Sequence, residues 1–213
     1  MKTQQKGFTL VEIAIVLVII GLLLGGILKG QEMITQAKIK NVIADFSGIS
    51  AAYHGYQDRY RAIPGDDPNA NTRWAGATQG NGDGQVAGTY NSATATDESR
   101  HWWDHLRRAG FVAGTGTQQP FNAVTGMLGV QTGNAASPVA AALGGFTSLI
   151  ICSANLPDKI AIAVDTQMDD GVPSTGTVRG FLQAAPNPAV PNGTPEVAYA
   201  ETGTNVYTLC RAL

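Results

Sequence analysis

Two oxygen-rich segments hold the residues that are best suited to binding a metal ion. The first is Asp66-Asp67, and the second is the glycine-rich run Asn81-Gly82-Asp83-Gly84-Gln85. Carboxylate and amide oxygens are the ligands that calcium prefers, and the second run is similar to the middle of a calcium loop. However, Gln79 and Tyr90 stand where the first Asp and the last Glu of such a loop belong. A turn-forming role is the alternative to calcium binding for these residues. The calcium candidates are Asp66, Asp67, Asn81 and Asp83.

Two histidines are the next residues whose spacing could support chemistry. His101 and His105 lie four residues apart in a segment expected to be helical, a spacing that can hold a metal ion. No third ligand is evident in the sequence, and the two flank the pair Trp102-Trp103, so a structural role is favoured. Ser, His and Asp all occur, but the sequence holds no Gly-x-Ser-x-Gly turn that would indicate a hydrolase triad. The sequence therefore predicts a protein without catalytic residues, that is, not an enzyme.

Glu12 is the third chemically unusual residue. It is the only charged residue in FTLVEIAIVLVIIGLLLGGIL, which covers residues 8–28. A carboxylate within such a run costs a few kcal/mol on membrane-insertion scales and indicates a function with a cationic partner. No Lys or Arg lies within the run to pair with it. The expected partner therefore comes from a chain terminus or from another molecule.

The same run has the length of a membrane-spanning helix. At about 1.5 Å per residue, 21 residues extend about 31 Å, the thickness of the hydrocarbon core of a bilayer. Lys2 and Lys6 precede it and favour a cytoplasmic N-terminus, which would place the remainder of the chain across the membrane. A cleaved secretory signal would have a shorter apolar run and a small-x-small cleavage site. Hydropathy alone leaves a plain signal anchor as an alternative.

Together these residues resemble a known N-terminus. The segment KGFTLVEIAIVLVIIGLLL is similar to the start of type IV prepilins, the family of type IV pilins and type II secretion pseudopilins. The resemblance implies that a prepilin peptidase cuts between Gly7 and Phe8 and that Phe8 is then N-methylated. It also implies that Glu12, the fifth residue of the mature chain, meets the N-terminal ammonium of a neighbouring subunit.

The apolar helix is expected to continue as an amphipathic one. Apolar residues recur at steps of three and four, which is typical of one helix face. They are Ile39, Val42, Ile43, Phe46, Ile49, Tyr53, Tyr56 and Tyr60. Many family members carry a Pro inside this helix, whereas this chain has Gly21, Gly25 and Gly26 and no Pro before Pro64-Gly65, which ends the pattern. One subunit cannot bury so much apolar surface, which favours the packing of many copies side by side.

Residues 64–213 contain all ten prolines and are predicted to form an α+β head with long loops. The expected elements are a helix from Thr96 to Gly110, a strand at Phe146–Ile151, an element at Pro157–Met168, and strands at Val178–Leu182 and Asn205–Cys210. The pattern at Pro157–Met168 fits a helix or a strand, and the Pro near its start favours the helix. The strands are expected to be antiparallel.

Cys152 and Cys210 are the two cysteines of the chain. In a domain expected outside the cytoplasm, an even pair is more often a disulfide than two free thiols. Such a bond would join the last strand to the central one and contribute ~3–4 kcal/mol, and a C-terminal disulfide resembles what many type IV pilins carry. The alternative, a nucleophilic cysteine, needs a basic activating group, and none is evident near either residue.

The predicted organisation has four parts: a cleaved leader at 1–7, a membrane and filament-core segment at 8–28, an amphipathic segment at 29–63, and the head at 64–213. The predicted fold class is α+β, a long N-terminal helix packed on a small antiparallel-sheet head, as in pilins. A net charge of −2 with 14 Lys and Arg argues against a strongly basic nucleic-acid-binding protein. No cofactor is expected apart from the calcium considered above.

The resemblance implies a structural subunit of a type IV pilus or pilus-like filament, which serves adhesion, motility or DNA uptake. Its partners would be further copies and related pilins, the prepilin peptidase and N-methyltransferase, and an inner-membrane assembly platform with its ATPase. It would lie in the inner membrane before assembly and at the cell surface afterwards. One alternative is a periplasmic type II secretion pseudopilin. Another, from a different class, is a membrane-anchored periplasmic enzyme or binding protein.

Overall fold

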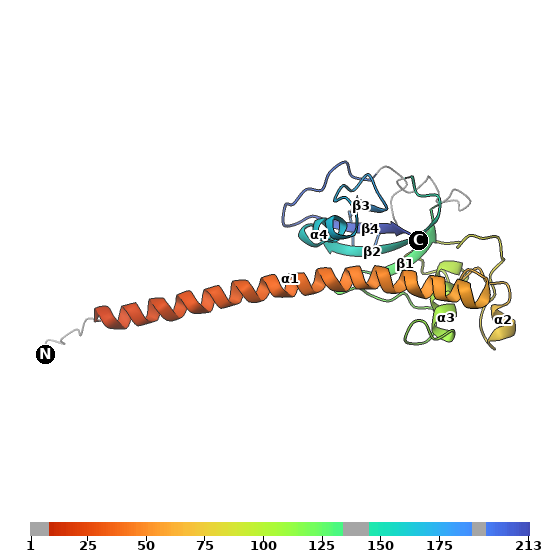
Figure 1. Ribbon diagram of the computed structural model, residues 1–213, viewed down its shortest axis with the longest axis horizontal. Helices are drawn as coiled ribbons and strands as arrows, with labels where there is room; N and C mark the ends of the chain where they lie inside the picture. Colours follow the sequence, from red (N-terminus) through yellow and green to blue (C-terminus); the bar gives the residue numbers. More distant parts are fainter. Residues whose placement is uncertain (1–8, 134–144, 189–194) are drawn as a thin grey trace. The chain divides into compact units, whose positions relative to one another are not determined.

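A computed structural model describes residues 9–133, 145–188 and 195–213 (Figure 1). Its elements are α1 (Leu10–Tyr60), α2 (Ala70–Arg73), α3 (Glu98–Arg108), β1 (Leu128–Thr132), β2 (Leu149–Pro157), α4 (Asp158–Met168), β3 (Val178–Leu182) and β4 (Val206–Ala212). The chain divides into two units, of which the first ends at Ala37 and the second is Lys38–Leu213. A long N-terminal helix and a small antiparallel sheet with further helices confirm the predicted α+β class.

The described part of the first unit is helical throughout and carries exposed apolar side chains. Their exposed fractions range from 46% at Ile20 to 91% at Leu10. The most apolar window of α1 has a mean hydropathy of 2.8 and none of it is buried, so the helix is long and apolar enough to cross a membrane. The glycines of this part do not interrupt the helix, and a Cβ on Gly21, Gly25 or Gly26 would meet no atom within 4 Å.

In the second unit, the remaining part of α1 contributes one side to the core. The predicted face is confirmed, because Ile39, Val42, Phe46, Ile49 and Tyr56 are buried and the other three members of the face pack against them. The helix ends at Tyr60, before the predicted limit at residue 63. Arg61 follows with a φ of 55°, and its N–H donates to Gln57 O at 2.8 Å, so a left-handed residue ends the helix.

The sheet of the second unit has the strand order β1-β2-β4-β3, and every neighbouring pair is antiparallel. Alternate residues face two apolar clusters. The larger cluster combines one sheet face with residues of α1, α3 and α4, including Trp102, Trp103 and Ile151. The smaller one lies on the other face, where Tyr90, Phe146 and Phe181 are packed with the two cysteines.

Most predicted head elements are present. α3, α4, β3 and β4 lie where the sequence predicts them, and Pro157 stands at the N-cap of α4, as the helical interpretation required. The strand predicted at Phe146–Ile151 is wrong in its bounds, because β2 begins at Leu149 and continues to Pro157. Phe146 is buried in the smaller cluster instead of pairing in the sheet. β1 was not predicted.

Candidate functional site

The N-terminal end of α1 is closed by a reciprocal pair of residues. Glu12 Oε2 accepts hydrogen bonds from the N–H of Thr9 at 2.7 Å and from Thr9 Oγ1 at 2.8 Å, and the N–H of Glu12 donates to Thr9 Oγ1 at 3.3 Å. The first N–H groups of a helix have no acceptor within the helix. A Thr-x-x-Glu capping box supplies acceptors for two of these N–H groups. Glu12 therefore caps its own helix.

This cap supplies hydrogen bonds and no positive charge, so the expected cationic partner of Glu12 stays a prediction. The pattern Thr9-x-x-Glu12 is itself a capping signal. Within the described residues, both side-chain hydrogen bonds go to Oε2, so Oε1 of Glu12 keeps its lone pairs. The predicted cleavage and methylation residues, Gly7 and Phe8, lie outside the described residues.

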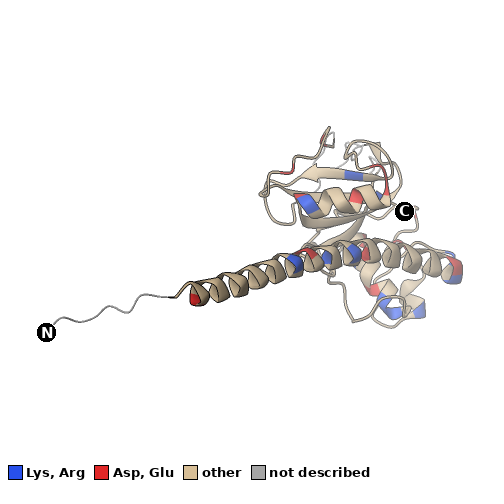
Figure 2. Ribbon diagram, turned by 60° about the vertical axis from the view of Figure 1, so that its left-hand side comes forward, with Lys and Arg blue, Asp and Glu red and all other residues tan. Residues whose placement is uncertain are grey.

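Charged residues are sparse along the first turns of α1 and become frequent in its second half (Figure 2). Between Leu10 and Leu28, the large apolar side chains are exposed on all sides of the helix. Exposure of such a surface to water costs about 25 cal/mol of free energy for each Å² of apolar area. The segment is therefore suited to a bilayer or to close packing against other apolar helices.

In the head, the structure brings three carboxylates together: Asp66, Asp83 and Glu98 each offer an oxygen within 4.8 Å of the others. Asp66 accepts backbone hydrogen bonds from Gly82 (2.5 Å), Asp83 (3.2 Å) and Gly84 (2.8 Å). Glu98 accepts from the N–H groups of Asn81 (3.1 Å) and Ala87 (2.9 Å). Glu98 was not among the predicted site residues, because it stands in the first turn of a helix and was interpreted as a helix-start signal.

The donor set fits a hard cation such as calcium, because it consists of carboxylates only. Burial raises the pKa of Asp66 and of Glu98, and the charges of Asp66 and Asp83 raise that of Glu98 further. However, five backbone N–H groups already occupy oxygens of Asp66 and Glu98, as a turn-forming role would require. Calcium binding at this cluster stays a prediction.

The other two calcium candidates have different places. The Asn81 side chain donates to Asp83 Oδ2 at 3.0 Å and accepts the N–H of Asp83 at 2.9 Å, which shapes the loop. Asp67 is fully buried and is directed away from the cluster to Tyr56 and Arg73. Its Oδ2 accepts Tyr56 Oη–H at 2.7 Å and forms an ion pair with Arg73. Asp67 therefore joins α1 to α2 and is not part of the three-carboxylate group.

His105 has the structural role that the sequence favoured. It is fully buried, its Nδ1 accepts the N–H of Gly65 at 2.9 Å, and its Nε2 lies 2.8 Å from Thr78 O. These contacts require the neutral ring with its proton on Nε2, and they leave no lone pair for a metal ion. Burial lowers the pKa of His105, and it lowers that of His101 as well.

The predicted disulfide is confirmed. Cys152 on β2 and Cys210 on β4 are register partners and are bonded across the two central strands. Both are fully buried in the smaller cluster. Tyr90, which replaces the last Glu of a calcium loop, is also buried there, and its hydroxyl donates to Pro188 O at 2.5 Å. The burial of the Tyr90 ring in this cluster explains why an aromatic residue, and not a calcium ligand, stands at this position.

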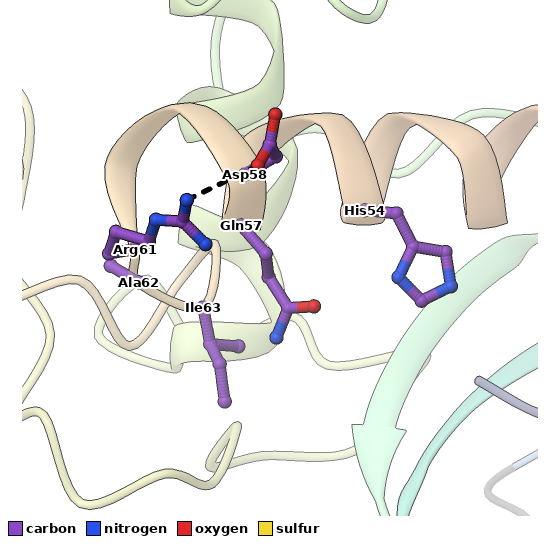
Figure 3. A pocket seen from close by; sticks show the side chains of 6 residues that line it. All are labelled: His54, Gln57, Asp58, Arg61, Ala62 and Ile63. Atoms are coloured by element: carbon purple, nitrogen blue, oxygen red, sulfur yellow. Dashed lines mark ion pairs between the residues drawn. The ribbon is translucent and has the colours of Figure 1, made fainter.

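An open depression of about 470 Å³ lies at the end of α1 (Figure 3). It is lined by His54, Gln57, Asp58, Arg61, Ala62 and Ile63. Its ion pair, Arg61 to Asp58 at 3.5 Å, joins side chains that are both 83% exposed. Exposed pairs of this kind contribute little, and the depression lacks the apolar enclosure of a small-molecule site.

A comparison with protein-family models matches residues 2–28 to the prokaryotic N-terminal methylation motif. The matched segment includes Gly7, Phe8 and Glu12, the residues on which the sequence resemblance rests. No curated protein and no solved structure matches the chain. The similarity thus concerns the N-terminal segment.

Proposed function

We propose that this type IV prepilin-like protein is processed and then polymerised through α1 into a type IV pilus or a pilus-like filament. The methylation motif at residues 2–28 supports a precursor of the pilin or pseudopilin type, hence a structural and not a catalytic protein. The observation that carries the finer proposal is the exposed apolar segment of α1 up to Leu28, with its single carboxylate, Glu12, at the N-terminal end.

The orientation in the membrane follows from charge and from the disulfide. Lys2 and Lys6 favour a cytoplasmic N-terminus. Disulfides persist in oxidising compartments, so the Cys152–Cys210 bond supports a head outside the cytoplasm. The proposed sequence of locations is therefore the inner membrane before assembly and the cell surface afterwards.

Assembly is proposed to complete the environment of Glu12. Cleavage between Gly7 and Phe8 would create an ammonium group on Phe8, and N-methylation would keep its charge. Glu12 Oε2 is engaged by Thr9, but Oε1 accepts no hydrogen bond from a described residue. The Phe8 ammonium of a neighbouring subunit can donate to this oxygen, and the two charges then compensate each other in apolar surroundings.

The proposed partners follow from the same steps. They are the prepilin peptidase and N-methyltransferase, other copies of the chain, related pilins, and an inner-membrane platform driven by an ATPase. A periplasmic pseudopilus of type II secretion would use the same helix. The neighbouring genes distinguish a pseudopilus from a pilus. A secretin gene beside genes for platform proteins favours secretion, and a gene for a retraction ATPase favours a pilus. A membrane-anchored enzyme or binding protein would retain its leader.

The test combines the mass of the mature chain with the substitution Glu12→Gln. Native protein should lack residues 1–7 and carry one methyl group, measured by intact-mass spectrometry. Breaking one side of a buried ion pair costs about 3–5 kcal/mol, which corresponds to a loss of more than about a hundredfold in an association constant. We expect Glu12→Gln to lower the yield of sheared filaments at least tenfold while membrane-bound subunit, detected by immunoblot, stays unchanged.

Glu32→Gln is the matched control, because this carboxylate lies in the same helix, is exposed, and forms an exposed pair with Lys29 at 2.7 Å. Its filament yield should equal that of the wild type. Wild-type assembly of Glu12→Gln, or a mature chain that retains Lys2, would contradict the proposal.

A further inference from the structure

A small basic depression lies at the C-terminal end of α3, away from the sites discussed so far. It has a volume of about 220 Å³ and is lined by Asp104, Arg107, Arg108, Gly114, Thr115 and Gly116. Arg108 forms an ion pair with Asp104 at 2.6 Å, whereas none of the ion pairs among the described residues includes Arg107. This Arg107 depression therefore carries one positive charge without a counter-ion.

The guanidinium of Arg107 keeps donors for a further acceptor. Its Nε donates to Ala113 O at 3.3 Å and its Nη1 to Gly116 O at 2.7 Å, while Nη2 donates to no acceptor in the described part of the chain. Burial lowers the pKa of Arg107, and the charge of Asp104 opposes this shift. A partly desolvated guanidinium with a free edge is well suited to a carboxylate, which can accept two parallel N–H bonds.

The loop after α3 adds backbone donors beside this guanidinium. Gly114 and Gly116 both adopt the left-handed region, with φ of 97° and 80°, which glycine tolerates without strain. The N–H groups of residues 113–116 donate to no acceptor among the residues that the structure describes. Successive free N–H groups favour anions. The Arg107 depression is therefore suited to a carboxylate.

Residues 195–203, the acidic strap, form a segment of the opposite charge. The strap contains Glu196 and Glu201 and no basic residue. Neither carboxylate takes part in any of the ion pairs of the described chain. Both side chains are exposed, and Val197, which lies between them in the sequence, is 83% exposed. The strap therefore presents two carboxylates and one apolar side chain to a partner.

Contacts to α4 hold the acidic strap in place before any partner binds. The Tyr199 hydroxyl donates to Asp165 Oδ2 at 2.6 Å, and the N–H of Gly203 donates to Asp158 Oδ2 at 2.7 Å. Both acceptors belong to α4 and are buried. Binding then requires little further ordering of the strap, which favours association.

The Arg107 depression and the acidic strap lie on different sides of the second unit. Figure 1 shows α3 on one side of α1 and α4, which holds the strap, on the other side. A single copy therefore cannot bring the two surfaces together, whereas two copies can. Each copy then uses a different surface, so the contact is heterologous, and contacts of this type generate open chains of subunits.

We propose that the Arg107 depression of one copy binds the acidic strap of a second copy, with the strap carboxylates on the guanidinium. The inference rests on the proposed function, because it names a contact between the heads of copies that polymerise through α1. Complementary charges steer association and fix the register between partners. The contact would also cover Val197, whose burial is favourable.

Disulfide trapping between two full-length chains tests the proposal. One chain carries Thr115→Cys and a second, differently tagged chain carries Val197→Cys, and both are co-expressed and oxidised in native membranes. Both positions are exposed, so we expect a heterodimer on a non-reducing gel. The control partner carries Asp58→Cys, which replaces a side chain that is also 83% exposed. This control should give at least about tenfold less heterodimer, because Asp58 lies outside both surfaces.

Charge reversal in the trapped pair identifies the groups in contact. Arg107→Glu in the Thr115→Cys chain should lower the amount of heterodimer at least about tenfold, because like charges then face each other. Glu196→Arg together with Glu201→Arg in the Val197→Cys chain should have the same effect, and the combination of both reversals should restore the heterodimer. The strap residues are exposed, so their reversal tests the proposal even if Arg107→Glu fails to fold, which circular dichroism reports.

Equal amounts of heterodimer with Val197→Cys and with Asp58→Cys would overturn the proposal. A loss with Arg107→Glu that reversal of the strap does not reproduce would assign another anion to the depression and overturn it as well. Filament yield separates this contact from the proposed function. Filaments without the trapped heterodimer contradict the head contact alone, whereas trapped heads with wild-type assembly of Glu12→Gln contradict the role proposed for Glu12 alone.

Discussion

Asp67→Asn is predicted to destabilise the head strongly without removing a calcium ligand. The carboxylate is fully buried between Tyr56, Arg73 and the N–H of Asn69, which donates to Oδ1 at 2.9 Å. An Asn can still accept from Asn69, but its NH₂ group would face the Tyr56 hydroxyl and the guanidinium. A buried hydroxyl without an acceptor costs about 1–3 kcal/mol. Breaking a buried ion pair costs about 3–5 kcal/mol.

These two costs overlap, and the Arg73 side chain is 26% exposed, so water reduces the cost of its lost partner. We therefore expect the free energy of unfolding to fall by about 3–5 kcal/mol in total. For a chain of this size, that corresponds to a fall in Tm of about 6–20 °C. Tryptophan fluorescence of the full-length protein in detergent measures it, in chelator and again in 5 mM calcium.

Asp58→Asn is the control, since this carboxylate is 83% exposed and faces Arg61 at 3.5 Å. Its effect should stay within about 0.5 kcal/mol. A loss below about 1 kcal/mol for Asp67→Asn would refute the buried-pair reasoning. A loss seen only in calcium would instead make Asp67 a calcium ligand, as the sequence first suggested.

Two further predictions concern the head. Burial lowers the pKa of His105 in the folded protein below the unfolded value of about 6.5. The neutral ring therefore contributes its full stability above about pH 6.5, and this contribution is lost as the pH falls below that value. The free energy of unfolding then falls by up to about 1.4 kcal/mol per pH unit. His105→Gln should therefore flatten the fall of Tm between pH 7 and pH 5, and equal slopes in variant and wild type would contradict the assigned neutral ring. Replacing Cys152 and Cys210 together by Ser opens a loop of 58 residues and should lower stability by about 4 kcal/mol in chemical denaturation, whereas reduction of the variant should change nothing further.

Much of the fold was predictable because the signals are local. The apolar run, the three-and-four periodicity of α1, the acidic start of α3 and the Pro at the start of α4 each act within a few residues. The Thr9-x-x-Glu12 cap is an equally local signal, although it was not predicted. The disulfide required only an even pair of cysteines and an oxidising compartment.

Strand β1 could not be predicted from its own residues. It is only five residues long and contains Gly129, which weakens a strand signal. That glycine is required by a distant contact, since a Cβ there would lie 2.0 Å from Tyr90 O. Pairing with β2 makes this segment a strand, and such pairing is a property of the folded chain.

The sequence by itself determined the membrane-length apolar helix, its single carboxylate and the α+β head, because composition and periodicity need no distant partner. Tertiary structure alone decided how neighbouring carboxylates differ. Asp66 and Asp67 are adjacent, yet one meets a loop with Asp83 and Glu98 while the other pairs with Tyr56 and Arg73. Asp165 is fully buried beside the Tyr199 hydroxyl, although nothing in its local pattern indicates it. The protonation and the ligands of a carboxylate depend on which groups the fold places around it, and these groups come from distant parts of the chain.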